Sequence, residues 1–501
     1  MNKFRLFIEN FLVYGLGGII SKVIPLIMVP IVTRLMPDTT YYGISDLSNT
    51  VVSFGSAIAI MGMYDAMYRM FFERDEDDYK KTVCSTAFLF TLFTSLVVFI
   101  VMLLEKDDDD FKKNVCSTAL LFTLSTSLVV FVIMLLAKDI IAQYFFSDQQ
   151  YANVGYLSAM ATLVGATNSI ISAPTRMQNK RKVFLITNTV SPMLSYAISI
   201  PMLLAGYYVI ALPLAAVVSG VIMEVAFGIM NKKWFDFRRF DSKLLKQLLI
   251  IAVPLLPNFL IYWIFNSSDK VMITNMVGIG AAGVYSVASK LGHASQLIYT
   301  AFAGGWQFFA FSTMKEDNQV KSNSIIFEYL GIISFIATSF VCAWSYLIFK
   351  FLFTDQYWSG YISAPYLFLS PLLQMLFQVA SNQFLVVKKT WPNMLILSSG
   401  AILNIILNYT LIPILGIEGA SIATLMGYIV SDIICVVVLL RIELMIISKR
   451  FVLASVLMLC FILVWRILFV DNIIVGMIGA CVFSCLCIWL YRKDIKKLLQ
   501  I

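Results

Sequence analysis

The sequence predicts an all-α polytopic membrane protein. Two observations support this prediction, namely the composition of the chain and the pattern of its apolar residues. Of the 501 residues, 60% are hydrophobic and only 13% are charged, whereas a soluble globular chain has about 45–50% apolar and 25% charged residues. The apolar residues form blocks of about 20 or more, the length at which a helix crosses a bilayer. A transmembrane β-barrel would instead alternate with a period of two over about ten residues.

Fifteen segments are long and apolar enough to span a membrane. The first could be taken for a signal peptide, but its apolar run continues to about Leu35 without a small-residue cleavage site. Pro254 and Pro257 predict a kink in the eighth segment, because proline lacks the backbone N–H that a helix needs. The approximate bounds are 11–35, 44–71, 82–104, 114–136, 152–174, 183–206, 208–229, 247–268, 281–310, 323–349, 360–386, 393–414, 417–440, 451–469 and 473–491.

The basic residues of the short loops predict the orientation of these spans. In the loops that follow the repeat, one set of alternate loops, together with the tail, holds 21 Lys and Arg residues, while the opposite set holds only Lys138 and Lys350. Basic loops face the cytoplasm, so both the C-terminus and, with fourteen spans, the N-terminus are expected there. Because the positive charge lies in loops, the net charge of +8 does not indicate a nucleic-acid partner.

One apolar segment occurs twice in tandem. Residues 77–104 and 109–136 are identical at 22 of 28 positions, at an offset of 32 residues. If both copies spanned the membrane, the basic loop at 73–81 and the N-terminus would be forced outside. We therefore expect about fourteen spans with an extra 32-residue copy of the third span, and either copy could be the surplus one.

A fainter repetition relates the two halves of the chain. The stretch "TRLMPDTTYYGISDLSN" resembles "TNMVGIGAAGVYSVASK", and Ile200-Pro201-Met202-Leu203 resembles Ile412-Pro413-Ile414-Leu415. Internal repeats that flank a midplane site are common in transporters. The expected organisation is an N-terminal helical lobe over 1–229, a cytoplasmic basic linker over 230–247, a C-terminal helical lobe over 248–441, and two additional helices with a cytoplasmic tail over 442–501.

Three stretches resemble the polysaccharide biosynthesis flippases, which are the O-antigen (Wzx-type) and related members of the multidrug/oligosaccharidyl-lipid/polysaccharide exporter superfamily. They are "YGLGGIISKVIPLIMVPIVTRLMPDTTYYGISDLSN", "GMYDAMYRMFFE" and "PLLPNFLIYWIFNSSDKVMITNMVGIGAAGVYSVASKL". Family members typically carry an Asp-Arg pair after the seventh span. Here the pair is Asp269-Lys270, which keeps the charges and lacks the guanidinium fork that suits a phosphate.

The resemblance implies a flippase with two pseudo-symmetric six-helix lobes plus two C-terminal helices. Its expected substrate is an undecaprenyl-diphosphate-linked oligosaccharide repeat unit, moved across the bacterial cytoplasmic (inner) membrane by alternating access. The glycan would serve O-antigen, capsule or exopolysaccharide assembly. Membrane lipids, a glycan polymerase and other assembly proteins are the expected partners. The extra copy of the third span is a departure from the family's fourteen-span pattern.

Ionisable residues within apolar spans are costly and usually face protein or water. Lysine is a usable phosphate ligand, so a cationic central cavity would suit a diphosphate. Snorkelling at a membrane face is the alternative for Arg34 and Lys270, and a purely structural pair is the alternative for Asp65 and Arg69. The expected substrate-binding residues are Lys22, Arg34, Arg69, Lys270 and Lys290.

Three further residues are candidates for charge balance or ion coupling: Asp65, Asp269 and His293. Each carboxylate would offset cations in the empty state. His293 is the single histidine, and its imidazole could carry a proton or act only as a packing residue. Proton or sodium coupling is open, and we expect no metal site and no other cofactor.

Other functions are less compatible with the sequence. No Gly-rich phosphate loop or nucleophile–base arrangement is present, and the longest expected loop is the basic segment 230–247, so an enzyme such as a glycosyl polymerase is not expected. A flippase for a lipid II-type precursor shares the diphosphate chemistry. A cation-coupled multidrug exporter of the same superfamily would favour a more apolar cavity.

Overall fold

The computed structural model describes residues 3–71, 110–178, 180–235, 241–298, 318–387 and 391–494, and every element within these ranges is a helix. Ten helices there are long and apolar enough to cross a membrane. The count is eleven if the bent pair Asp355–Ile362 and Ala364–Phe384, at 49°, is one span. The predicted all-α polytopic membrane fold is confirmed, and the total of fourteen spans stays a prediction.

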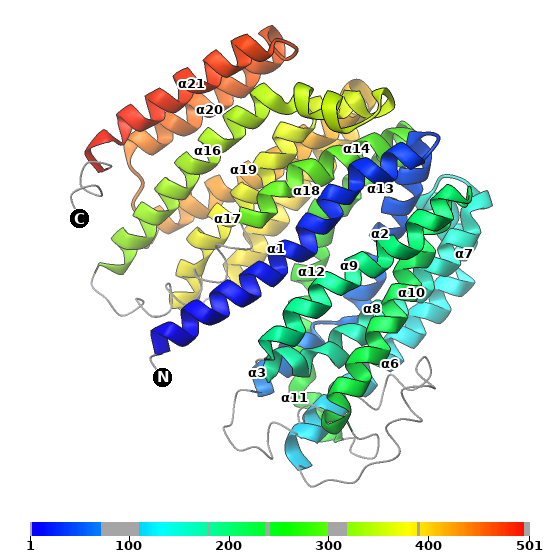
Figure 1. The fold of residues 1–501 in the computed structure, drawn as a ribbon. Helices are drawn as coiled ribbons and strands as arrows, with labels where there is room; N and C mark the ends of the chain where they lie inside the picture. The colour runs from blue at the N-terminus through cyan, green and yellow to red at the C-terminus, as the bar shows by residue number, and fades with distance from the viewer. Residues whose placement is uncertain are drawn as a thin grey trace. The chain divides into compact units, whose positions relative to one another are not determined.

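The chain divides into two compact units. Unit 1 consists of Met1–Met28 and Tyr41–Asn275, and unit 2 consists of Val29–Thr40 and Met276–Ile501. Figure 1 labels their helices. The first helix, α1 (Lys3–Leu35), therefore begins in unit 1, and its last residues belong to unit 2.

Unit 1 is built mainly from long helices, and in its described part α8 lies among them as the helix with the most neighbours. Helix α8 packs against α6 and α10, and α10 packs against α9 (Figure 1). The second copy of the repeat forms α6, while the first copy lies outside the described residues. The elements are α2 (Thr39–Ile60), α3 (Met63–Phe71), α6 (Asp110–Leu136), α7 (Lys138–Phe145), η1 (Gln149–Tyr151), α8 (Ala152–Met177), α9 (Arg181–Leu204), α10 (Ala211–Asn231), η2 (Lys232–Trp234), α11 (Ser242–Ala252), η3 (Val253–Leu255), α12 (Leu256–Trp263), η4 (Ile264–Ser268) and α13 (Asp269–Met276).

Buried polar side chains fix α10 against α8. Thr167 donates to Glu224 at 2.8 Å, and Asn231 Nδ2 donates to the Ile171 carbonyl at 2.9 Å and to Thr175 Oγ1 at 2.8 Å. All of these side chains are buried. In an apolar environment such bonds hold helices together, because an unpaired polar group there is costly.

The expected second span, 44–71, is broken by a turn at Gly62. Its φ of +74° favours glycine. A Cβ at this position would also lie 2.6 Å from the Ala252 carbonyl oxygen. The turn therefore lets α3 lie close against α11, which begins where Asp241 caps the backbone N–H groups of Lys243 and Leu244.

The eighth expected span is longer than predicted and changes geometry along its length. A single candidate span covers Ser242–Met276. It contains a 3-10 turn at Val253–Leu255, where Pro254 lies, and a π turn at Ile264–Ser268, directly before Asp269. π turns inside α-helices are frequent at functional sites.

Unit 2 is also helical throughout its described part. Helix α19 packs against α17, α18 and α14, while α16 packs against α17, α20 and α21. Gly416, with φ +59° and ψ −133°, makes the turn from α18 to α19. The elements are α14 (Ile279–Gly292), η5 (His293–Ser295), α16 (Gln319–Leu352), η6 (Asp355–Ile362), α17 (Ala364–Val386), α18 (Trp391–Leu415), α19 (Ile417–Arg441), α20 (Lys449–Leu468) and α21 (Ile473–Leu490).

Two charged groups attach the C-terminal helices α20 and α21 to the rest of unit 2. Arg466 on α20 makes a two-point contact with Glu418 on α19, with Nε at 2.5 Å and Nη2 at 2.8 Å from the carboxylate oxygens. Near the other end of α20, Glu328 on α16 accepts hydrogen bonds from Ser448 and from Tyr491. Bidentate Arg–carboxylate pairs are geometrically specific, so the two contacts fix α20 relative to α16 and α19.

Candidate functional site

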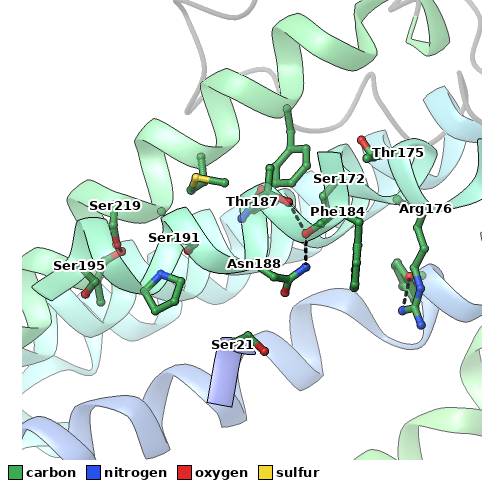
Figure 2. Close-up of a pocket in the computed structure, with 18 residues that line it drawn as sticks. Ser21, Ser172, Thr175, Arg176, Phe184, Thr187, Asn188, Ser191, Ser195 and Ser219 are labelled. Carbon is green, nitrogen blue, oxygen red and sulfur yellow. Dashed lines mark hydrogen bonds between the residues drawn. The ribbon is translucent and has the colours of Figure 1, made fainter. Parts of the chain in front are cut away.

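Unit 1 contains a cavity of about 570 Å³ that is lined by polar and apolar residues. Its wall combines seven serine or threonine hydroxyls, two asparagine amides, one tyrosine and one arginine. Figure 2 shows Arg176 at one end of the lining and Ser195 and Ser219 at the other. The polar lining residues are Ser21, Tyr64, Asn168, Ser172, Thr175, Arg176, Thr187, Asn188, Ser191, Ser195 and Ser219.

Helical periodicity places these groups on one wall. On α8, Asn168, Ser172 and Arg176 are spaced four residues apart, so they lie on one face of the helix. On α9, Thr187 to Ser195 repeat polar residues at intervals of three or four. Helices α1, α3 and α10 complete the lining.

Several wall hydroxyls donate their hydrogen to their own helix. Thr187 donates to the Val183 carbonyl at 2.9 Å, and Ser172 donates to the Ser169 carbonyl at 3.2 Å. A hydroxyl has two further acceptor lone pairs, which stay available to a ligand. The buried Oδ1 of Asn168 has no hydrogen-bond partner among the described residues, so the wall can accept hydrogen bonds from a polyhydroxylated ligand.

Arg176 is the one cation among the described residues of the lining. Its Nη1 donates to the Tyr64 hydroxyl at 3.4 Å, and its guanidinium lies 5.7 Å from the centre of the Phe184 ring. Asp65, next to Tyr64, is close enough to interact electrostatically with Arg176. The contacts orient the guanidinium while leaving the side chain exposed, so it can meet an anionic group.

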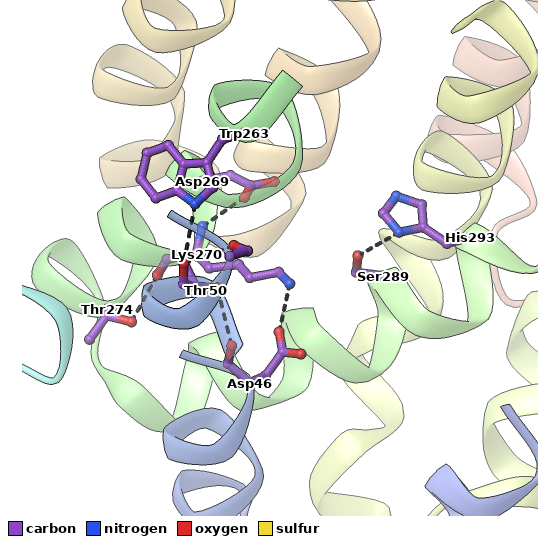
Figure 3. A network of polar contacts seen from close by, with 9 residues as sticks. Asp46, Thr50, Trp263, Asp269, Lys270, Thr274, Ser289 and His293 are labelled. Atoms are coloured by element: carbon purple, nitrogen blue, oxygen red, sulfur yellow. Dashed lines mark hydrogen bonds and ion pairs between the residues drawn. The ribbon is translucent and has the colours of Figure 1, made fainter. Parts of the chain in front are cut away.

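A second polar cluster of unit 1 joins α2 to α13 (Figure 3). Lys270 Nζ lies 2.6 Å from Asp46 Oδ2, and both side chains are largely buried. Asp269, 3% exposed, accepts the backbone N–H of Lys270 at 2.8 Å. Trp263, the last residue of α12, donates to the Thr50 carbonyl of α2 at 3.2 Å.

In this cluster one buried lysine, Lys270, lies near two buried carboxylates, Asp46 and Asp269. The partner of the Lys270 ammonium is Asp46, which the sequence did not single out, while Asp269 also interacts electrostatically with it. A buried pair of this kind requires both members, since a lone buried charge is costly. The pair therefore holds α13 against α2.

The remaining predicted residues lie in different places. Lys22 is exposed and directly follows Ser21 of the cavity lining. Arg34 donates to the Phe351 carbonyl in the last turn of α16, at 3.0 Å, where a cation is favourable. Lys290 is half-buried at the end of α14, and His293 Nδ1 is 3.4 Å from Ser289 Oγ. The side chain of Arg69 lies outside the described residues.

The structure thus brings Tyr64, next to Asp65, together with Arg176, and Asp269 and Lys270 together with Asp46. In the sequence, Arg176 is one of the 21 basic residues of the alternate loops, and the cavity asparagines Asn168 and Asn188 were not predicted as site residues. The signal was present, because Asn168, Ser172 and Arg176 recur at helical spacing in an otherwise apolar segment. No group of three or more metal-ligating side chains occurs among the residues that the structure describes.

One family model matches this chain. Residues 102–362 match the model of a family described as polysaccharide biosynthesis protein. A comparison with curated proteins gives no match.

Several solved structures have a similar fold. A lipid II flippase MurJ in an inward-closed conformation has a TM-score of 0.67 and 14% identity, over 97% of this chain and 100% of that chain. An outward-facing multidrug resistance MATE family transporter of the MOP superfamily has a TM-score of 0.56 and 13% identity, over 87% and 95%. A variant of the Vibrio cholerae MATE transporter VcmN has a TM-score of 0.54 and 11% identity, over 87% and 96%.

Proposed function

The chain belongs to the polysaccharide biosynthesis protein family, and from that premise we propose that it is a flippase for undecaprenyl-diphosphate-linked oligosaccharide repeat units. It moves them across the bacterial cytoplasmic membrane by alternating access, with both termini in the cytoplasm. The glycan serves O-antigen, capsule or exopolysaccharide assembly. A glycan polymerase or other assembly protein is the proposed downstream partner.

The observation that carries this proposal is the chemistry of the unit 1 cavity. Sugars present many hydroxyls, each of which donates and accepts hydrogen bonds, and the cavity wall offers hydroxyl and amide groups that do both. A diphosphate requires positive charge, and Arg176 supplies a guanidinium that can bind phosphate oxygens in pairs. The cavity volume of about 570 Å³ falls in the usual range for ligand sites.

The lining also separates this proposal from its alternatives. A multidrug exporter would be served by an apolar cavity, whereas eleven of the eighteen lining residues here are polar. A lipid II-type precursor has the same diphosphate and also carries sugars, so it stays the nearest alternative substrate.

Each predicted residue has a place in this proposal. Arg176 is the principal phosphate contact, and Lys22, adjacent to the lining residue Ser21, is the second. Arg34, Arg69, Lys270 and Lys290 stay predicted substrate contacts, and Asp65 balances the charge of Arg176 in the empty cavity. Asp269 and His293 stay candidates for charge balance or ion coupling.

Replacing Arg176 tests the cavity directly. A charge-assisted hydrogen bond contributes about 1.5–3 kcal/mol, so Arg176→Ala should lower export by roughly tenfold or more, and Arg176→Lys should retain part of it. The measurement is surface display of the native glycan in a strain whose own copy is deleted, with the amount of each variant in the membrane determined in parallel.

The matched control is Lys182→Ala, an exposed basic residue nearby on α9 that does not line the cavity. Purified protein gives a second readout, namely the shift in melting temperature caused by undecaprenyl diphosphate. If Arg176→Ala exports at the wild-type rate and keeps the wild-type shift, Arg176 does not bind the substrate. If the wild-type protein fails to restore display despite normal insertion, the flippase proposal is wrong.

A further inference from the structure

One buried carboxyl group of unit 2 has no hydrogen-bond or ion-pair partner among the described residues. Asp432 lies in the second half of α19, 9% exposed. Both of its carboxyl oxygens are buried without a hydrogen-bond partner. No ion pair among the described residues includes it.

The other two buried acids in the described part of unit 2 are satisfied. Glu418 pairs with Arg466 through two hydrogen bonds. Glu328 accepts hydrogen bonds from the backbone N–H and hydroxyl of Ser448 and from the Tyr491 hydroxyl. Asp432 therefore differs from the other buried acids described in this unit, each of which has hydrogen-bond partners.

The helices around Asp432 supply little positive charge. Helices α17, α18 and α14 pack against α19. The first two contain no charged residue, and the third carries Lys290, which is not ion-paired with Asp432. The other titratable groups on these helices, on α19 and on the adjoining η5 are Tyr285, His293, Tyr366, Tyr409, Glu418, Tyr428, Cys435 and Arg441.

Uncharged amides lie at a similar level. In the chain, α18 follows α17 and reverses its direction, and α19 reverses it again, so α17 and α19 run in the same direction. Gln378 is eight residues before the end of α17 at Val386, and Asp432 is nine residues before the end of α19 at Arg441. Gln378 Oε1 and, one turn further along α17, Asn382 Nδ2 are also buried without partners among the described residues. An amide can exchange hydrogen bonds with either the protonated or the ionised form of a carboxyl group.

An ionised carboxylate in such a place is strongly disfavoured, because both oxygens are buried and no lysine or arginine among the described residues pairs with them. The neutral acid avoids the cost of burying a charge and keeps only the smaller cost of a buried polar group, which a hydrogen bond to a nearby amide would offset. The surroundings of Asp432 in this conformation therefore favour its protonated, neutral form. It could ionise only when a change in unit 2 admits water to α19.

We propose that Asp432 is a proton-binding carboxyl that couples the transport cycle to proton movement. When water reaches α19, the O–H bond breaks, the proton passes to water and the hydrated carboxylate remains; closure requires the reverse step. This inference rests on the proposed transport function and adds an ion to it. It assigns coupling to a residue of unit 2 outside the three candidates that the sequence suggested.

Infrared spectroscopy of the purified full-length chain in lipid, recorded as the difference between acidic and alkaline pH, tests the assignment. The wild type should lose the carbonyl-stretch band of one protonated carboxyl as the pH rises, and Asp432→Asn should lack this band. Asp432→Glu should restore it at a shifted frequency. The matched control is Asp355→Asn, an exposed aspartate of η6, which should keep the band.

Two results for this carbonyl-stretch band would contradict the proposal. A wild-type spectrum indistinguishable from that of Asp432→Asn would overturn the proposal, as would a band that NaCl removes at constant pH, because sodium would then be the occupant. If Asp432→Asn does not fold, the comparison of wild type with Asp432→Glu decides, and an unshifted band contradicts the assignment. The infrared spectrum does not depend on transport. Failure of the flippase proposal in the display assay and failure of the Asp432 proposal in the spectrum can therefore be told apart.

Discussion

Replacing Asp46 with alanine is expected to destabilise the protein strongly. The substitution leaves the buried Lys270 ammonium without the carboxylate that lies 2.6 Å away. Breaking a buried pair by removing one partner costs about 3–5 kcal/mol, which for a chain of this length corresponds to a fall in melting temperature of roughly 3–5 °C. The measurement is thermal denaturation of the purified protein in detergent, together with its amount in the membrane.

The double variant Asp46→Leu with Lys270→Met is the control, because replacing both partners with apolar groups of similar size is often nearly neutral. It should melt close to the wild type. Its export activity then distinguishes two roles of Lys270. A stable and active double variant would show a structural role, whereas a stable and inactive one would support substrate binding. If Asp46→Ala alone melts at the wild-type temperature, the pair does not stabilise unit 1.

Deleting residues 77–108 is expected to give a protein that inserts, folds and exports as well as the full chain or better. The deletion removes one copy of the repeat and keeps the second, which forms α6 and packs against α8. The resulting order of loops also satisfies the rule that basic loops face the cytoplasm. Surface display of the glycan and the amount of protein in the membrane are the measurements.

The reciprocal deletion of residues 105–136 should give a less stable protein. It joins the first copy to Ala137 and so places Phe88 where Leu120 now lies, in the apolar core of unit 1 with no exposed surface. Overpacking of this kind costs about 1–3 kcal/mol.

The matched control introduces Leu120→Phe into the chain that lacks residues 77–108, and it should lower the melting temperature by a similar amount. If the two deletion variants melt at the same temperature, the position of α6 accepts the first and the second copy of the repeat equally well. Failure of the first deletion to insert would show that the additional copy is needed.

Much of the fold is predictable from the sequence because of the bilayer. A helix that crosses a membrane must be apolar over about 20 residues, and every backbone group in it must bond within the segment. The span at 183–206, for example, corresponds to α9 at Arg181–Leu204. The break at Gly62 was not predicted, because the approach of Ala252 that it accommodates comes from a residue far along the chain.

The candidate site was predictable only in part. Asp269 and Lys270 attract notice as charges at the end of an apolar segment, but their environment includes Asp46 from α2, and no spacing in the sequence relates residues so far apart. The cavity is a similar case, since Asn168 and Asn188 are unremarkable polar residues on separate helices until α8 and α9 place them on one wall.

The sequence by itself determined the class of protein, the approximate spans and the family resemblance, because hydropathy and loop charge act locally along the chain. The tertiary structure alone decided which charges are paired, which polar faces enclose the unit 1 cavity, and that Asp432 has no partner among the described residues. The physical reason is that the cost of burying a charge depends on what surrounds it, and those surroundings are assembled from distant segments.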